Sequence, residues 1–179
     1  MKHTLSCLRS SGLSRSVFVV AFLVVLSGVV LSDGTTRGLV SAAFDVSALG
    51  QSPPTNQEQH FWSNALGKEM VYTVYLPQGY VSEPDRRYPV LYMLHGLGGD
   101  HNQWAREGLF TTATDLIQNG EMPPLIIVTP EGERGYWMDH ASNGPRFGTY
   151  VSQDLVETID SQFRTIAARE GRAIGGLSM

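Results

Sequence analysis

The sequence predicts an α/β fold in which a mostly parallel sheet carries helices on its faces. Three apolar stretches, 89–94, 125–129 and 172–174, have the length of strands, and the first two are continuous runs typical of strands buried on both faces. Two stretches with helical patterns, 108–118 and 151–163, separate them. An alternation of strands and helices of this kind is characteristic of a parallel sheet, because each crossover runs through a helix.

Two further strands are predicted before this alternating part. Residues 70–76 alternate and are rich in β-branched and aromatic side chains, and residues 59–64 precede them across a turn at 65–68. The pair is expected to form an antiparallel hairpin. Residues 43–58 contain Ser, Pro, Asn and Gln with little periodicity, which indicates a linker or extended arm, so the α/β domain is predicted to span 59–179.

The first 42 residues have the pattern of a secretory signal peptide. Basic residues precede the apolar run Val17–Leu31, whose fifteen residues are fewer than the roughly 20 that a membrane-spanning helix needs. Small residues that suit signal cleavage follow, with Val40-Ser41-Ala42 as the better candidate. The protein is therefore expected to be exported, and an uncleaved membrane anchor over Val17–Leu31 is the alternative.

Composition and charge exclude several classes of function. The 179 residues are 42% hydrophobic and 17% charged, as in a globular domain, and a net charge of −4 without a basic cluster argues against nucleic-acid binding. The single cysteine, Cys7, excludes a disulfide framework, and the scattered histidines indicate no metal site. No lysine follows Lys68 and no phosphate-binding glycine motif is present, so we expect no nucleotide or other cofactor.

A candidate nucleophile lies at the end of the last predicted strand. Gly176-Leu177-Ser178 is the first half of the G-x-S-x-G nucleophile elbow, a turn in which residues flanking the serine must be small because a Cβ would clash with neighbouring backbone. The same tripeptide pattern occurs at 12–14 and 50–52, where no strand precedes it. Ser178 is therefore the candidate catalytic serine, and an ordinary turn serine is the alternative interpretation.

The glycine-rich loop after the strand 89–94 is the candidate oxyanion hole. A serine nucleophile needs a base, an orienting acid and backbone N–H groups that bind the developing oxyanion. In elbow-type sites one N–H belongs to the residue after the serine, here Met179, and another to a loop after an upstream strand. We expect the second donor to be the Leu97 N–H. The rest of the loop is His95, Gly96, Gly98 and Gly99. A tight turn without a catalytic role, which also needs glycines, is the alternative.

Aromatic residues near these loops are candidates for a substrate cleft. Trp104, Tyr136 and Trp137 lie in or just after the loops that follow the buried strands. They are expected either to line an acyl- or sugar-binding cleft or to pack the loops against the sheet, and the sequence favours neither. Asp139 and His140 are not taken as a catalytic dyad, because side chains adjacent in sequence rarely point at a common partner.

With these residues identified, the chain resembles the esterase D-like family of α/β-hydrolases over about Phe61 to Met179. The segments that carry the resemblance are VYLPQGY, YPVLYMLHGLGGD, LIIVTPEG and EGRAIGGLSM. The family includes S-formylglutathione hydrolases, feruloyl and acetylxylan esterases and the antigen 85 mycolyltransferases. The resemblance implies an α/β-hydrolase fold, Ser178 as the nucleophile, and the Leu97 and Met179 N–H groups as the oxyanion hole.

The resemblance also shows where this chain departs from the family pattern. The family usually has Asp-Gly after the strand 125–129, where this chain has Glu131-Gly132, so Glu131 is a candidate substrate contact. The family's catalytic acid and histidine lie downstream of the serine and are absent, so we expect the N-terminal portion of an exported serine esterase, inactive by itself. Carbohydrate-linked carboxylic esters are a candidate substrate class. An acyltransferase of the antigen 85 type and a non-catalytic glycan-binding homologue are the alternatives.

Overall fold

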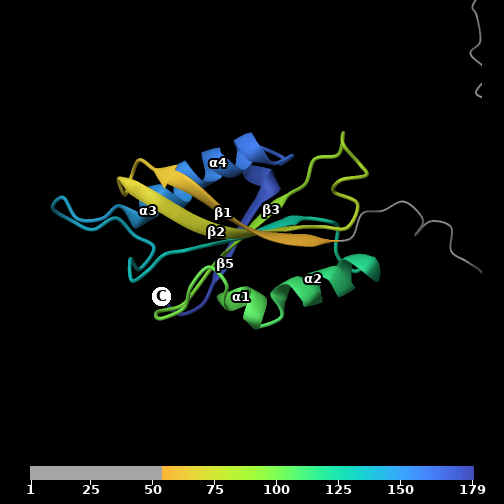
Figure 1. The fold of residues 1–179 in the computed structure, drawn as a ribbon, viewed down its shortest axis with the longest axis horizontal. Coiled ribbons are helices and arrows are strands. Elements are labelled where there is room, and N and C mark those ends of the chain that lie inside the picture. Colours follow the sequence, from red (N-terminus) through yellow and green to blue (C-terminus); the bar gives the residue numbers. More distant parts are fainter. Residues whose placement is uncertain (1–53) are drawn as a thin grey trace, which may run out of the picture. The chain divides into compact units, whose positions relative to one another are not determined.

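The computed structural model describes residues 54–179, so the predicted signal segment and most of the predicted linker lie outside the described part. Five strands form one sheet in the order β1-β2-β4-β3-β5 (Figure 1). The strands are β1 Thr55–Ser63, β2 Lys68–Leu76, β3 Val90–Leu94, β4 Ile126–Pro130 and β5 Arg172–Gly176. β2 is antiparallel to β1 and to β4, whereas β3 is parallel to both β4 and β5. The sheet is thus mixed, and its parallel part is the α/β unit that the sequence predicts.

Helices cover both faces of the sheet. Helices α1 and α2 connect β3 to β4 on one face, whereas α3, a π-helix and α4 connect β4 to β5 on the other (Figure 1). β4 and β5 flank β3 on opposite sides, and right-handed crossovers in opposite directions place their helices on opposite faces. The bounds are α1 Gln103–Arg106, α2 Leu109–Gln118, α3 Phe147–Thr149, the π-helix Tyr150–Asp154, α4 Leu155–Gln162 and a 3₁₀ turn Arg169–Gly171. Within residues 54–179, none of these helices is long and apolar enough to cross a membrane.

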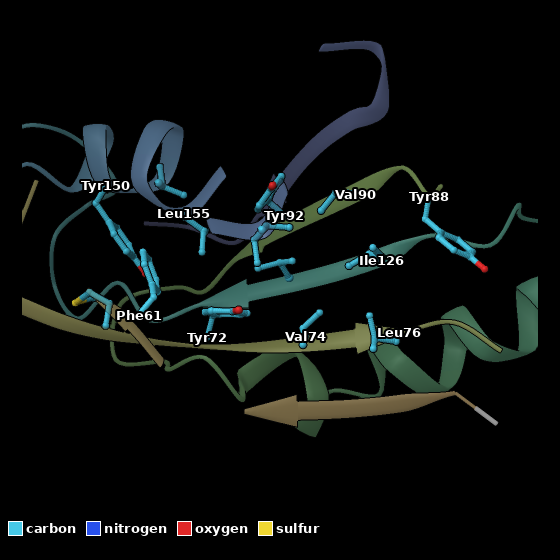
Figure 2. Close-up of a cluster of buried hydrophobic side chains, with 14 of the residues drawn as sticks. Phe61, Tyr72, Val74, Leu76, Tyr88, Val90, Tyr92, Ile126, Tyr150 and Leu155 are labelled. Carbon is cyan, nitrogen blue, oxygen red and sulfur yellow. The ribbon is translucent and has the colours of Figure 1, made fainter. Parts of the chain in front are cut away.

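Alternating strand side chains divide the core between the two faces. On the face beneath α4, Tyr72 and Val74 of β2 pack in one fully buried cluster with Leu155 (Figure 2). Tyr75 points to the opposite face, where its ring stacks on Phe110 of α2 with centroids 5.4 Å apart. Because both faces of the sheet are covered, the central strands need apolar side chains at nearly every position, which explains their continuous apolar runs.

The predicted linker contains the first half of a strand. β1 begins at Thr55, four residues before the predicted start and inside the stretch 43–58 that was expected to be irregular. Thr55 pairs with Leu76 and the register continues to Ser63 opposite Lys68. The first residues of β1 are polar because this edge strand is largely exposed there, so no apolar alternation marks them in the sequence.

The helical stretch predicted over 151–163 is confirmed from residue 151 to 162, and its first turn is π-helical. Tyr150–Asp154 forms a π-helical turn, α4 continues to Gln162, and Phe163 is already extended. The turn has a structural role: the Asp154 carboxylate accepts hydrogen bonds from the Ser63 hydroxyl at 2.6 Å and the Ala65 N–H at 2.8 Å. The carboxylate therefore ties the β1–β2 turn to the helical layer.

Candidate active site

Ser178 lies two residues after the end of β5. The Leu177 N–H donates to the Leu94 carbonyl at 3.2 Å, which holds the turn against the end of β3. A Cβ on Gly176 would lie 3.0 Å from the same carbonyl oxygen, so a side chain there forces the backbone apart. Ser178 has a φ of +56°, in the left-handed region that residues other than glycine rarely adopt. A serine in a strained turn after a strand has the local geometry of a nucleophile elbow.

The glycine-rich loop after β3 faces this turn. The Gly99 N–H donates to the Gly96 carbonyl at 2.9 Å, and Gly98 has a φ of +84°, so the loop folds back tightly. Residues 96–99, part of α1 and the elbow residues Leu177 and Ser178 line one open pocket of about 350 Å³. The Leu97 N–H takes part in none of the backbone hydrogen bonds between residues 54 and 179. The structure therefore brings the candidate nucleophile and the candidate oxyanion donor into one pocket.

A second pocket of about 380 Å³ adjoins the elbow and is mainly apolar. It is lined by Trp137, by Ile174 of β5, and by the chain from Gly175 to Met179. Trp137 is one of the predicted cleft residues, and it lines the same pocket as Ser178. Ile174 is 66% exposed and contributes to the apolar lining of this pocket.

Two other predicted aromatic residues do not line either pocket. The Trp104 indole N–H donates to the Leu94 carbonyl at 3.2 Å, the same oxygen that accepts from the elbow, so Trp104 supports the end of β3. Tyr136 is 49% exposed with a φ of +51° and lies outside both linings. For Trp104 the packing interpretation is therefore favoured, and Trp137 alone of the three has a place in the cleft.

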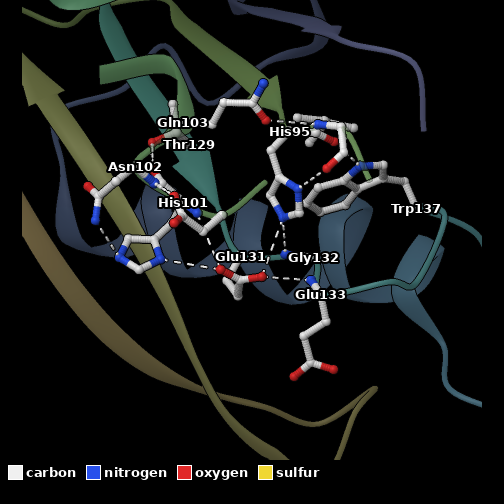
Figure 3. Close-up of polar contacts among 12 residues, drawn as sticks. His95, His101, Asn102, Gln103, Thr129, Glu131, Gly132, Glu133 and Trp137 are labelled. Atoms are coloured by element: carbon white, nitrogen blue, oxygen red, sulfur yellow. Dashed lines mark hydrogen bonds and ion pairs between the residues drawn. The ribbon is translucent and has the colours of Figure 1, made fainter. Parts of the chain in front are cut away.

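Glu131 is also not a pocket residue, and its carboxylate instead lies between His95, which begins the glycine-rich loop, and His101, which follows it (Figure 3). Its Oε2 lies 3.3 Å from both the backbone nitrogen and Nδ1 of His101, and its Oε1 accepts from the Glu133 N–H at 2.7 Å and lies 3.4 Å from Nε2 of His95. His101 continues outward to Glu58 of β1, with 2.9 Å between Nε2 and Oε2. Glu131 was expected to contact substrate, and in the structure its carboxylate contacts residues on either side of the glycine-rich loop instead of lining either pocket.

His95 is fully buried and forms hydrogen bonds through both ring nitrogens (Figure 3). Nδ1 lies 2.8 Å from the Gly96 carbonyl oxygen, and Nε2 lies 2.8 Å from the Gly132 nitrogen. Because a carbonyl only accepts and an N–H only donates, these contacts assign a neutral imidazole with its proton on Nδ1. Trp137 adds a hydrogen bond from its indole N–H to the His95 carbonyl at 3.1 Å.

Electrostatics act on this buried pair in opposite directions. Burial lowers the pKa of His95, but the Glu131 carboxylate and the Gly96 carbonyl outweigh it and raise that pKa above its usual value. A proton on Nε2 would point to Glu131 and would break the hydrogen bond that Nε2 accepts from the Gly132 N–H. Because this hydrogen bond is present, the imidazole of His95 is neutral. Burial raises the pKa of Glu131, but its contacts with His95, Glu133 and His101 lower it to about 2. Glu131 is therefore ionised at neutral pH, and a carboxylate with so low a pKa is only a weak proton acceptor.

Within residues 54–179, no histidine is arranged as a base for Ser178. His60 Nε2 lies 3.5 Å from Glu58 Oε1, and His95 is occupied as described. His101 binds Glu58 and Glu131, and His140 lies 3.4 Å from the Gly135 carbonyl. The Asp139 carboxylate accepts hydrogen bonds from the N–H and the hydroxyl of Thr149, so it orients the start of the helical segment. The side chains of Asp139 and His140 thus have separate partners in the structure.

Comparisons with known proteins identify the family and the fold of the chain. Residues 63–179 match the family described as "Putative esterase". The chain is 35% identical over 130 residues, 69% of its length, to an endo-1,4-beta-xylanase/feruloyl esterase of Xylanibacter ruminicola, of which it covers 18%. It is 36% identical over 123 residues, 66% of its length, to an esterase of Mycobacterium tuberculosis, of which it covers 26%.

Solved structures show the same relationship. A ferulic acid esterase superposes with a TM-score of 0.65 at 30% identity, over 71% of this chain and 50% of that one. An S-formylglutathione hydrolase of Agrobacterium tumefaciens has a TM-score of 0.58 at 21% identity, over 72% of this chain and 51% of that one, and supports the fold alone. The fold is that of the α/β-hydrolases. The chain belongs to the Putative esterase family, and it spans about half or less of the length of these relatives.

The residues that sequence reasoning missed are those that hold the loops together. His101 bridges Glu131 and Glu58, and its carbonyl accepts from the Thr129 hydroxyl at 2.6 Å. Asn102 accepts from the Thr73 hydroxyl of β2 at 3.0 Å. The only signal in the sequence was the position of His101 and Asn102 directly after the glycine-rich loop.

Proposed function

We propose that the protein is a carboxylic ester hydrolase that works through an acyl-enzyme on Ser178. The observation that carries the proposal is the strained turn of Ser178 in the pocket that it shares with the Leu97 N–H. Membership of the esterase family supports the same reaction class. The serine acyl-enzyme itself is our inference from this arrangement.

In the proposed reaction, Ser178 Oγ forms a bond to the ester carbonyl carbon and passes its proton to a base. The carbonyl oxygen becomes an oxyanion bound by the Leu97 and Met179 N–H groups. The C–O bond to the alcohol then breaks, and the alcohol leaves with the proton. Water hydrolyses the acyl-enzyme and restores the Ser178 hydroxyl. The loss of one oxyanion donor typically costs about 3–4 kcal/mol of transition-state stabilisation, so the donors account for much of the expected rate.

Feruloyl and acetyl esters of carbohydrates are the first substrates that we propose to test. The X. ruminicola relative is named for feruloyl ester hydrolysis, and a relative from Caldicellulosiruptor saccharolyticus, 26% identical, is named acetyl esterase. The apolar pocket with the Trp137 wall suits an aromatic or short acyl group. An alcohol acceptor in place of water would convert the same site to acyl transfer.

We infer export from the N-terminal segment, which has basic residues followed by the apolar run Val17–Leu31. The N-terminal sequence of the mature protein tests this inference. A first residue near position 43 supports cleavage after Ala42, and an intact Met1 in a membrane fraction supports an anchor.

The enzymatic test uses the complete open reading frame that contains this sequence. Wild type and Ser178→Ala are assayed on p-nitrophenyl acetate and on feruloyl and acetyl sugar esters. We expect hydrolysis by wild type and a loss of at least about 1,000-fold in the variant, since removal of a catalytic nucleophile leaves only residual binding and oxyanion effects. Hydrolysis that survives the substitution would refute the mechanism.

A further inference from the structure

Loops far apart in the sequence are joined behind the candidate oxyanion hole. His95 begins the glycine-rich loop that contains Leu97, and His101 lies two residues after its last glycine. Three hydrogen bonds join these two residues to the end of β4 and the chain that follows it. The Thr129 hydroxyl donates to the His101 carbonyl at 2.6 Å, the Gly132 N–H donates to His95 Nε2 at 2.8 Å, and the Trp137 indole N–H donates to the His95 carbonyl at 3.1 Å. The loop is thus held at its ends by the chain after β4.

Glu131 is the charged group at the centre of these contacts. Its carboxylate contacts both ends of the loop, with Oε1 3.4 Å from His95 Nε2 and Oε2 3.3 Å from His101 Nδ1 (Figure 3). The middle of the loop is Gly96-Leu97-Gly98-Gly99, which has little side chain with which to fix its own shape. The position of the Leu97 N–H therefore depends on how firmly the two histidines are held.

We propose that Glu131 is a positioning residue for the esterase reaction. Its carboxylate binds the backbone N–H and the ring of His101 and thereby holds the loop so that the Leu97 N–H stays open to the pocket of Ser178. The inference rests on the proposed function and deepens it. It concerns a residue that touches neither pocket and acts only through the loop.

Two other roles for Glu131 fit the structure less well. A substrate contact would require the carboxylate to line one of the pockets beside Ser178, and it lines neither. A general base would need a free oxygen near the serine. Instead, Oε2 accepts from the His101 backbone N–H and Oε1 accepts from the Glu133 N–H. The side chain is 19% exposed, so little water competes for these contacts.

The test compares Glu131→Gln with Glu133→Gln in the full-length protein. Glu133 is a matched control because it lies two residues away, is half-exposed, and pairs with Lys68 at 2.6 Å outside the loop contact. Both variants lose one negative charge and keep the size of the side chain. Steady-state kinetics on p-nitrophenyl acetate are normalised to the fraction of protein that a fluorophosphonate labels at saturation, so misfolded molecules are not counted.

We expect Glu131→Gln to lower kcat by about 10- to 100-fold with KM changed less than about twofold, because a displaced donor weakens transition-state binding more than substrate binding. Glu133→Gln should keep kcat within about twofold, as expected for a screened surface pair. An unchanged kcat with a lower melting temperature would show that Glu131 only stabilises the fold, and a raised KM at unchanged kcat would show a substrate contact. Either result overturns the inference.

A second variant keeps the test decisive if Glu131→Gln is not recovered folded. His101→Ala removes one of the two rings and leaves the carboxylate, and kcat should fall at least about fivefold with KM unchanged. An unchanged kcat in this variant also overturns the inference. Ser178→Ala, measured alongside, separates the two proposals: activity that survives in Ser178→Ala refutes the proposed function, whereas its loss together with normal kcat in Glu131→Gln refutes only the role of Glu131.

Discussion

Glu131→Gln should destabilise the protein by an amount that depends on pH. The contacts of this carboxylate lower its pKa from 4.5 to about 2, which favours the ionised form in the folded state. Each tenfold change in acid strength is worth about 1.4 kcal/mol, so the carboxylate contributes at most about 3 kcal/mol to the free energy of unfolding. The contribution is an upper value, because the contact with His95 counts fully only when that imidazole is protonated.

The sign of the pH dependence follows from the lowered pKa. The folded state binds fewer protons than the unfolded state, so the contribution is complete above pH 4.5 and is lost as the pH falls toward 2. At pH 3 about half of it should remain. His95 is neutral in the folded state and is common to wild type and both variants, so its own titration cancels when their stabilities are compared. The difference between wild type and Glu131→Gln from pH 6 downward therefore isolates the effect of Glu131.

The assay is urea unfolding of wild type, Glu131→Gln and Glu133→Gln between pH 6 and pH 3. We expect the difference between wild type and Glu131→Gln to be about 2–3 kcal/mol at pH 6 and to shrink steadily toward pH 3. The Glu133 control should differ from wild type by less than about 1 kcal/mol at pH 6, since it removes a half-exposed pair. A difference for Glu131→Gln below about 1 kcal/mol at pH 6, or one that stays constant down to pH 3, would refute the assignment.

Two further predictions concern the core and the cleft. Tyr72→Phe removes a hydroxyl that donates to Gln162 at 2.7 Å and should cost about 0.5–1.5 kcal/mol. Tyr92→Phe removes a buried hydroxyl that has no hydrogen-bond partner among residues 54–179, so the free energy of unfolding should stay the same or rise. Parallel urea titrations measure both variants, and an equal loss of stability in the two would contradict this prediction. Gly132→Ala would place a Cβ 2.3 Å from the Trp137 ring, so it should displace the indole from the cleft and lower kcat/KM for feruloyl esters more than for acetyl esters. An equal loss on both esters would count against Trp137 as an acyl-pocket wall.

The buried strands and the two loops at their ends could be predicted because their physics is local. β3 and β4 are covered on both faces, so nearly every residue is apolar and the pattern is unmistakable. Glycines at 96, 98 and 176 mark positions where the backbone turns sharply or another chain segment lies close. From these features the sequence predicts that Leu97 and Ser178 belong to one site, and in the structure both residues line one pocket.

The parts that escaped prediction depend on exposure or on distant partners. The first half of β1 is polar because its side chains are exposed, and strand pairing with β2 rather than apolar burial makes it a strand. The π-helical turn before α4 differs from an α-helix by one hydrogen-bond register, which leaves no mark on the apolar spacing. The role of Glu131 arises from His101, thirty residues earlier in the chain, and no local pattern connects the two.

A covalent trap tests the central claim most directly. The full-length protein is treated with a fluorophosphonate, which forms a P–O bond to an activated serine with loss of fluoride, and the labelled peptide is identified by mass spectrometry. We predict one adduct per molecule, located on Ser178, and loss of ester hydrolysis in proportion to labelling. An adduct on another serine that abolishes activity, or hydrolysis that continues with Ser178 fully labelled, would contradict the account.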